Sequence, residues 1–409
     1  MAKIDPAQQR EFALEIVQTL RRNGYEALWA GGCVRDDVLG IVPQDYDVAT
    51  SATPDEIRTL FGPRKTLNIG AAFGVVTVLG RKSAGPIEVA TFRSDAQYSD
   101  GRHPDQVIFT SAEEDARRRD FTINGLFYDP VSEQVIDYVQ GQADLAAGVI
   151  RAIGQPAERI HEDKLRMLRA VRFTATFDFQ IEPSTLQAIQ NSAQGITQVS
   201  AERIGMEMRR MLVDRNRARA VELLRQTQLL KPLFPEVAGV DDLAWQQTLQ
   251  VLAQIKPSDL SLPLAVLLHP TRDRLTAQNV GRRMRWTNKE ITRAEWLLEK
   301  IPDVQTSQTL PWPRLQRVLI HEGAGDLIAM AEAYTGELNP NLVSCRKYLA
   351  MPPEVLNPTP LVNGADLIAH GLTPGPEFAP LLEQVRDAQL EGTITTRQEA
   401  LDLVDRLQG

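Results

Sequence analysis

The chain has 409 residues and a formal net charge of −8 at pH 7, from 45 Lys and Arg against 53 Asp and Glu. Its 43% hydrophobic and 24% charged content excludes a disordered or collagen-like chain, and the length suggests roughly two to four domains. Two cysteines, no apolar run of bilayer length and no apolar leader exclude a disulfide framework and a membrane protein, and they predict a cytoplasmic location.

The N-terminal part of the chain, up to about residue 145, alternates short helix and strand patterns, which predicts a mixed α/β unit. The spacing of Phe12, Ile16 and Leu20 favours a helix at the start. The elements expected up to residue 60 are a helix over 5–23, a strand at 26–30, a short helix at 35–39, a strand around 46–48, and a helix that starts with the capping box at Thr53.

The rest of this unit repeats the same kind of pattern. The elements expected there are strands at 74–80 and 86–92, a polar loop over 94–106, a helix that opens with a second capping box at Ser111 and carries Arg117 to Asp120, and strands at 125–129 and 134–138. Together they predict a small mixed sheet with helices on one side.

After about residue 145 the alternation fades and helix-length patterns with short Pro or Gly breaks take over. Helices are expected at 158–177, 184–194, 200–213, 216–228, 241–254, 289–300, 314–321, 323–334, 377–391 and 395–407. The fold class is therefore α+β, with a mixed-sheet head followed by an all-helical region.

The strongest chemical signal lies in residues 31–50. Gly31 and Gly32 follow a strand, where they let the backbone approach a ligand closely, and Arg35 comes next. Ten residues later Asp45 and Asp47 are spaced to place two carboxylates on one face of a strand. Two adjacent carboxylates repel each other unless a cation lies between them, and hard oxygen ligands suit Mg²⁺. Two aspartates at this spacing, taken alone, more often mark a solvated strand end, but the glycine turn ahead of them favours the metal site.

Two further groups extend this site. Glu88, in the strand at 86–92, could face the two aspartates as a third catalytic carboxylate, or it could be an ordinary exposed strand residue. Arg118 and Arg119, beside Asp120, offer donors for triphosphate oxygens, with Asp120 placed to orient them. Taken alone, such an arginine run would more often be a solvated helix face.

A second cluster begins at residue 162. Glu162, Arg166 and Arg169 share a narrow arc of the expected helix, with Asp163 at its flank. On spacing alone, a surface ladder of ion pairs is the more common outcome. The functional interpretation is base recognition, because an Asp accepts from an exocyclic amine and an Arg donates to the adjacent ring acceptor. Cytosine and adenine both present that combination, whereas uracil and guanine do not.

These motifs resemble those of the polymerase-β-like nucleotidyltransferases, and more narrowly the class II group of bacterial CCA-adding tRNA nucleotidyltransferases and related poly(A) polymerases. The match rests on Gly31–Asp36 with Asp45–Thr50, on Arg118–Asn124, and on Glu162–Arg166 continued by Arg169 and Arg172. The segment from Thr91 to Pro104 resembles the family's flexible loop, with His103 where many members have Arg. The tail from Val362 to Pro376 also looks like that of CCA-adding enzymes, so the resemblance covers most of the chain.

The resemblance implies the following organisation and site. It implies a catalytic head at 1–145, a neck with the nucleotide-template motif at 146–225, an RNA-binding body at 226–350 and a tRNA-binding tail at 351–409. It implies Asp45 and Asp47 as catalytic residues and as ligands of a two-magnesium site, to which the strand pattern adds Glu88 as a third catalytic carboxylate. It also implies nucleotide binding by Gly31, Gly32, Arg35, Arg118, Arg119, Asp120, Asn124, Glu162, Asp163, Arg166, Arg169 and Arg172. Within that set, Asp163 and Arg166 would select the base and Glu162 would hold Arg166.

The implied reaction is template-independent addition of C, C and A to the tRNA 3′ end from CTP and ATP, with no protein partner and no membrane. A bacterial poly(A) polymerase shares every motif, although this chain lacks a basic C-terminal extension. An enzyme that adds only CC or only A also stays open. A catalytically dead RNA-binding protein would be expected to have lost an aspartate, and a small-molecule nucleotidyltransferase would not need the long helical region.

RNA binding has weaker support in the sequence. Arginines cluster on consecutive expected helices, where such faces can follow a phosphate backbone, and solvated faces are an equally common reason for them. These residues are Arg203, Arg209, Arg210, Arg215, Arg217 and Arg219, with Arg282, Arg283 and Arg285 further on.

Overall fold

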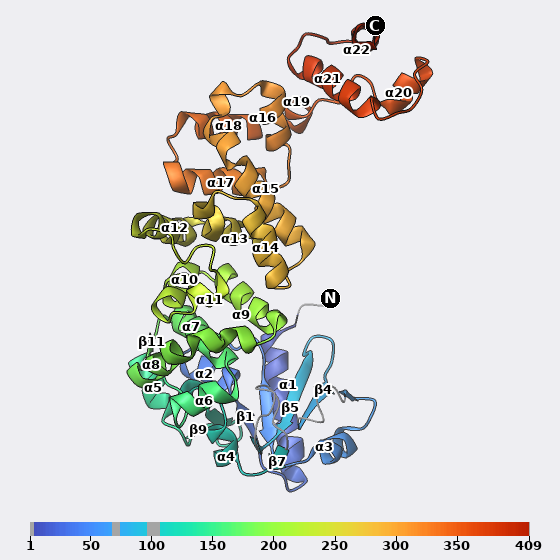
Figure 1. The fold of residues 1–409 in the computed structure, drawn as a ribbon. Helices are drawn as coiled ribbons and strands as arrows, with labels where there is room; N and C mark the ends of the chain where they lie inside the picture. Colours follow the sequence, from blue (N-terminus) through green and yellow to red (C-terminus); the bar gives the residue numbers. More distant parts are fainter. Residues whose placement is uncertain (1–3, 68–73, 96–106, 409) are drawn as a thin grey trace. The chain divides into compact units, whose positions relative to one another are not determined.

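The computed structural model describes residues 4–67, 74–95 and 107–408 (Figure 1). The chain forms two compact units, residues 1–238 and 239–409, and each is described by itself below. The first contains a mixed sheet followed by helices and the second is helical, which confirms the predicted fold class. The division into four domains stays a prediction. Throughout the described residues, every helix is too short or too polar to cross a lipid bilayer.

The centre of the first unit is a seven-stranded sheet in the order β3-β4-β5-β2-β1-β8-β9. Its strands are β1 (Ala27–Ala30), β2 (Asp47–Thr50), β3 (Thr66–Leu67), β4 (Val75–Leu79), β5 (Pro86–Thr91), β8 (Leu126–Asp129) and β9 (Gln134–Asp137). Only β2 and β5 pair in parallel, and their register places Asp47 opposite Glu88. Residues opposite each other in a ladder point to the same face, so these two carboxylates share one face of the sheet.

Helices cover both faces of this sheet, so the expectation of helices on one side was wrong. On one face, Trp29 of β1 lies under Arg10 of α1 (Pro6–Arg22). On the opposite face, Leu28 belongs to the same apolar cluster as Ala112 and Ala116 of α4 (Ala112–Arg117). Leu28 and Trp29 are consecutive residues of β1, and neighbouring strand residues point to opposite faces of the sheet. The two helices therefore lie on opposite faces.

Several short elements escaped the sequence analysis because they have too few residues for a periodic pattern. They are β6 (Arg93–Asp95) and β7 (Val107–Phe109), which pair with each other, β10 (Val149–Ile150) and β11 (Gln180–Ile181), which pair in parallel, the 3-10 helix η2 (Thr122–Asn124), and α5 (Gly141–Ala147). α2 (Gly32–Val38) starts three residues before the expected position, and α3 spans Pro54–Phe61. Thr53 caps α3 with the expected reciprocal capping box. The flexible-loop segment around His103 lies outside the described residues.

The expected single helix over 158–177 is two helices, α6 (Pro156–Glu162) and α7 (Leu165–Phe177). Asp163 between them has an extended backbone, with φ −144° and ψ 103°. Its carboxylate accepts a hydrogen bond from the backbone N–H of Leu165 at 3.0 Å. A short acidic side chain that bonds to the backbone in this way competes with helix continuation. The remaining helices of this unit are α8 (Pro183–Ser192), the 3-10 helix η3 (Ala193–Gln198), α9 (Ala201–Val213), α10 (Arg217–Gln226) and α11 (Leu230–Leu233).

The second unit is built of helices throughout its described residues. They are α12 (Asp242–Gln254), α13 (Ser261–Leu268), η4 (His269–Thr271), α14 (Leu275–Arg283), α15 (Asn288–Gln305), η5 (Ser307–Thr309), α16 (Trp312–Leu319), α17 (Ala324–Thr335), α18 (Pro340–Leu349), α19 (Pro353–Leu356), α20 (Gly364–Ala369), α21 (Phe378–Leu390) and α22 (Arg397–Gln408). All eight residues of α13 are buried, so its sequence has no polar face and no helical period to detect. The last three helices share an apolar cluster of their own around Leu367, Val385 and Val404.

A buried ion pair ties α7 to the segment between α4 and η2. Asp120 follows α4, and its Oδ2 accepts from Nε of Arg169 on α7 at 2.7 Å. Its Oδ1 accepts from the side-chain amide of Asn124 at 3.0 Å and from the N–H of Phe121 at 2.9 Å. Burial alone would raise the pKa of Asp120, but Arg169, Asn124 and Arg166 together lower it to about 2. The folded protein therefore strongly favours the ionised carboxylate.

We expect Asp120→Asn to destabilise the first unit in a pH-dependent manner. A pKa of about 2 in the folded protein, against an ordinary 3.8, corresponds to roughly 2–3 kcal/mol of stability at neutral pH. Because the folded pKa is the lower one, this contribution is complete above about pH 5 and is lost as the pH falls from about 4 towards 2. Urea unfolding followed by circular dichroism at pH 7, 5, 4 and 3 would measure it.

The matched control for this prediction is Asp178→Asn, which removes a carboxylate that is 74% exposed and pairs with Arg219. An exposed pair contributes little, so its effect should be small at every pH. A stability gap between wild type and Asp120→Asn that stays constant from pH 7 to pH 3 would contradict the assignment of this ion pair.

Candidate active site

A pocket of about 330 Å³ in the first unit gathers most of the residues singled out from the sequence. It is lined by Gly31, Gly32, Arg35, Asp47, Arg118, Arg119, Asp120, Asn124, Asp163, Arg166, Arg169 and Phe173. All of these except Phe173 were predicted site residues. The predicted residues outside the lining are Asp45, Glu88, Glu162 and Arg172. Residues from β1 to α7 therefore meet at one place, while their individual roles stay predictions.

The turn between β1 and α2 forms one wall. Gly31 has a positive φ of 72°, a conformation that side chains disfavour. A Cβ atom on Gly31 would also lie 2.8 Å from Nη1 of Arg119. Glycine is thus required here for two reasons: the turn needs the positive φ, and the guanidinium of Arg119 needs the space.

Three carboxylates lie on or just before the two central strands β2 and β5. Asp47 is the first residue of β2, and Glu88 lies opposite it on β5. Asp45 precedes the strand, so the argument that both aspartates project from one strand holds only for Asp47. Burial raises the pKa of Asp47 to about 6, the negative charges of Glu88 and Asp45 add to the rise, and Arg119 opposes it. Protein atoms surround the Asp47 carboxylate closely enough to raise its pKa, but the residue keeps access to solvent, so a ligand can reach it.

These carboxylates fit a magnesium site in ligand type and charge. Burial is the main cause of the raised pKa of Asp47, and the charges of Glu88 and Asp45 add to it; a bound cation would offset both effects. Among the described residues, no three His, Cys, Asp or Glu side chains are gathered closely enough to hold a metal ion as they stand. The donors for a metal are therefore present, and the metal itself belongs to the proposal below.

Arg118 and Arg119 are held by one carboxylate that the sequence analysis did not single out. Asp115 of α4 is 2% exposed, and its Oδ1 accepts from Arg118 at 2.7 Å while its Oδ2 accepts from Arg119 at 3.0 Å. Burial would raise the pKa of Asp115, but the two arginines lower it below its ordinary value. α4 ends at Arg117, so Arg118, Arg119 and Asp120 follow the helix, whereas they were expected to be part of it.

Arg35 and Asn124 continue this network. Nη1 of Arg35 donates to the side-chain oxygen of Asn124 at 2.6 Å, and Asn124 in turn donates to Asp120. Asp36 accepts from Nη2 of Arg35 at 2.7 Å. The chain of contacts from Arg35 through Asn124 and Asp120 to Arg169 links the glycine turn to α7.

Glu162 contacts Arg166, as the resemblance implied. The Oε2 of Glu162 accepts from Nη1 of Arg166 at 2.6 Å and from Nη1 of Arg159 at 2.9 Å. Arg166 also donates to the backbone oxygen of Arg159 at 2.9 Å. Because the helix breaks at Asp163, the two partners belong to different helices, and the contact bridges that break rather than running along one helix face.

Asp163 has a partner that the sequence analysis missed. Its Oδ2 accepts from Nη2 of Arg203 on α9 at 2.7 Å. One turn further along α9, Glu207 accepts from Nε of Arg172 at 2.6 Å. The arginine clusters in the sequence suggest RNA contact for Arg203, whereas in the structure its side chain bonds to Asp163 within the protein. The sequence does not show that α9 packs near Asp163, which lies 40 residues before Arg203, so this partner could not be predicted from it.

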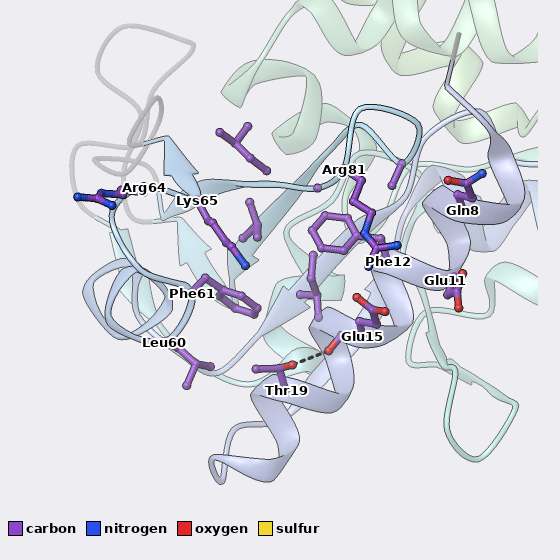
Figure 2. Close-up of a pocket in the computed structure, with 15 residues that line it drawn as sticks. Gln8, Glu11, Phe12, Glu15, Thr19, Leu60, Phe61, Arg64, Lys65 and Arg81 are labelled. Carbon is purple, nitrogen blue, oxygen red and sulfur yellow. Dashed lines mark hydrogen bonds between the residues drawn. The ribbon is translucent and has the colours of Figure 1, made fainter. Parts of the chain in front are cut away.

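A larger cavity lies elsewhere in the first unit. It has a volume of about 660 Å³ and lies between α1, the end of α3 and β4 (Figure 2). Phe12 and Phe61 line it together with both acidic and basic side chains, among them Glu15, Lys65 and Arg81. None of the predicted site residues is in its lining. The smaller pocket is therefore the candidate active site, on the basis of its chemistry rather than its size.

Two family models match the chain. The poly A polymerase head domain matches residues 27–151, and the probable RNA and SrmB-binding site of polymerase A matches residues 178–240. The first match contains the glycine turn, the three carboxylates Asp45, Asp47 and Glu88, and the arginines beside Asp120. The second contains α9, which supplies Arg203 and Glu207.

The comparisons with whole proteins extend over nearly the entire chain. The CCA-adding enzymes of Lactobacillus helveticus and Geobacillus stearothermophilus are each 33% identical and aligned over 95% of both chains. The crystal structure of the Bacillus stearothermophilus CCA-adding enzyme in complex with CTP is 30% identical and superposes with a TM-score of 0.79, covering 98% of both chains. The Thermotoga maritima enzyme complexed with tRNA shares the fold at 22% identity, with a TM-score of 0.70 over 100% of this chain and 97% of that one. On this similarity across its whole length, the chain belongs to the CCA-adding enzyme family.

Proposed function

We propose that this protein adds C, C and A to the 3′ end of tRNA, using CTP and ATP and no nucleic-acid template. The supporting observation is that one pocket holds Asp47, four arginines suited to a triphosphate, and the Asp163 and Arg166 side chains suited to a base. The relatives are named for this activity, and one of them was crystallised with CTP. The free cysteines Cys33 and Cys345 accord with a cytoplasmic location, which is part of the same proposal.

In the reaction, the 3′-oxygen of the tRNA attacks the α-phosphorus, a new P–O bond forms, the proton of the hydroxyl is lost, and pyrophosphate leaves. Magnesium ions bound at Asp45 and Asp47, with Glu88 beside them, would make the 3′-hydroxyl more acidic and offset the phosphate charge. Arg118 and Arg119, fixed by Asp115, bind the phosphate oxygens and stabilise the charge on the departing pyrophosphate. Their fixed position means that little reorganisation is needed during the step.

The base is selected by Asp163 and Arg166, which lie at and just after the break between α6 and α7. Asp163 accepts from the exocyclic amine of cytosine or adenine, and Arg166 donates to the neighbouring ring nitrogen. Arg203 fixes the Asp163 carboxylate and Glu162 fixes the Arg166 guanidinium, so the pair meets the base in one orientation. Uracil and guanine present a carbonyl to Asp163, which leaves two acceptors facing each other.

One assay tests the proposal. Purified protein with Mg²⁺, CTP and ATP would be given a tRNA transcript that ends before CCA and, separately, an unstructured RNA, and the products resolved at single-nucleotide length. Addition of three nucleotides to the tRNA followed by arrest is the expected result. One or two additions would indicate a partial-adding enzyme, a long A tail would indicate a poly(A) polymerase, and tRNA binding without addition would indicate a non-catalytic protein.

We predict that Asp45→Asn and Asp47→Asn each lower kcat by at least about a hundredfold, since each removes a carboxylate that would hold the metal. tRNA binding, measured by filter retention, and thermal unfolding should change little. Asp55→Asn, an exposed carboxylate in the first turn of α3, is the matched control and should retain full activity. Near-wild-type turnover in Asp47→Asn would remove the metal assignment.

We also predict that Asp163→Ala relaxes the preference for CTP and ATP over UTP and GTP by about tenfold or more. Arg203→Ala should act in the same direction but more weakly, because Asp163 remains, and Arg203→Lys should restore part of the preference. Single-nucleotide incorporation with each of the four triphosphates measures the effect. Arg215→Ala, an exposed arginine two residues after α9, should leave the preference unchanged. Unchanged base choice in Asp163→Ala would show that this residue does not read the base.

A further inference from the structure

Three arginines lie against a single phenyl ring, that of Phe173 on α7. The guanidinium carbon of Arg172 is 4.1 Å from the ring centroid, and those of Arg35 and Arg169 are each 5.2 Å away. Phe173 is also the one lining residue of the pocket that the sequence analysis did not single out. The sequence alone does not distinguish a phenylalanine that only fills the core from one whose ring contacts three arginines.

The ring is fixed in place by other aromatic side chains. Phe121 contacts it edge-on, with centroids 6.0 Å apart, and Phe177 stacks nearly parallel to it at 6.1 Å and 12°. Phe173 is 5% exposed. Phe177 also contacts Arg35, at 4.6 Å, so Arg35 lies against two rings of the stack.

Each of the three arginines has a polar anchor at its other side. Arg35 bonds to Asn124 and Asp36, Arg169 to Asp120, and Arg172 to Glu207. The anchors fix the direction of each guanidinium, but three like charges on one ring still repel one another. Burial lowers the pKa of Arg172, and the charges of Arg169 and Arg210 act in the same direction. The electron-rich face of a phenyl ring attracts cations and partly offsets such repulsion.

We propose that Phe173 is a positioning residue for the triphosphate: its ring holds Arg35 and Arg169, which line the pocket, in place before the nucleotide arrives, while Arg172 lies against the same ring outside the lining. The inference rests on the proposed function, because it assigns the triphosphate to this wall of the pocket. The ligand class is a polyphosphate anion. No direct contact between Phe173 and the reacting atoms is part of the proposal.

The base-reading side chains are anchored separately. Asp163 is held by Arg203 and Arg166 by Glu162, and neither contact involves the ring. Removing the ring should therefore weaken binding of every triphosphate by the same factor. The preference for one base over another should stay as it is, which a general distortion of the pocket would not allow.

The test is Phe173→Leu in the full-length protein. Leucine keeps the apolar volume approximately but has no π face. We expect KM for CTP and for ATP to rise by about tenfold, with kcat changed less than about threefold. Binding of inorganic triphosphate, measured by calorimetry in Mg²⁺, should weaken by a similar factor. Phe173→Tyr, which keeps the ring, should restore most of the affinity.

Two neighbouring variants make the comparison internal to the same aromatic run. Phe177→Leu removes the ring that contacts only Arg35 among these arginines, so its effect on KM should be smaller. Phe179→Leu removes a ring that contacts Phe177 but none of the three, and it should leave KM unchanged. Thermal unfolding of each variant reports whether the fold is intact.

The proposal is overturned if triphosphate binding by folded Phe173→Leu is within twofold of wild type, or if Phe179→Leu weakens it equally. It is also overturned if kcat and base preference collapse while KM stays constant. These results are distinct from failure of the proposed function, which would be absence of CCA addition by the wild-type protein. The calorimetric measurement with inorganic triphosphate does not depend on which nucleotide is transferred.

Discussion

The pocket depends on buried carboxylates that hold arginines in fixed positions. Asp115 holds Arg118 and Arg119, and Asp120 holds Arg169. Leaving any of these acids without its arginine would place an unpaired charge in the protein interior, which costs several kcal/mol. The same pairs that suit the pocket to a polyanion therefore also stabilise the fold, and the two requirements cannot be separated at these positions.

The sequence predicts the parts of this site that are contiguous. The glycine turn, the two aspartates and the Arg118–Asp120 run are recognisable because residue type and spacing both carry the chemistry within a few residues. The strands of the sheet, apart from the two-residue β3, were predicted for the same reason, since alternation is a local property. Asp115, Arg203 and Glu207 could not be assigned in this way, because their importance comes from partners on other elements of the fold.

The break at Asp163 shows how a local pattern can mislead. The apolar spacing across 158–177 is compatible with one helix, and nothing in it marks residue 163 as a joint. The structure ends α6 there because the Asp163 side chain bonds to the backbone of α7. The break also lets Asp163 line the pocket. The same side chain therefore explains why one continuous helix was wrongly expected and why Asp163 is available to contact a base. α13 escaped prediction for the opposite reason, because it is apolar on all sides and has no period.

The burial of α13 also has a consequence for how the chain is made. Its packing partners include α15 and α17, which follow it in the sequence. Because those helices follow α13 in the chain, they can cover the apolar segment 261–268 completely only after residue 335 has been synthesised. A nascent chain that ends before residue 335 therefore carries an apolar segment whose packing partners are incomplete, and such exposed surface promotes aggregation.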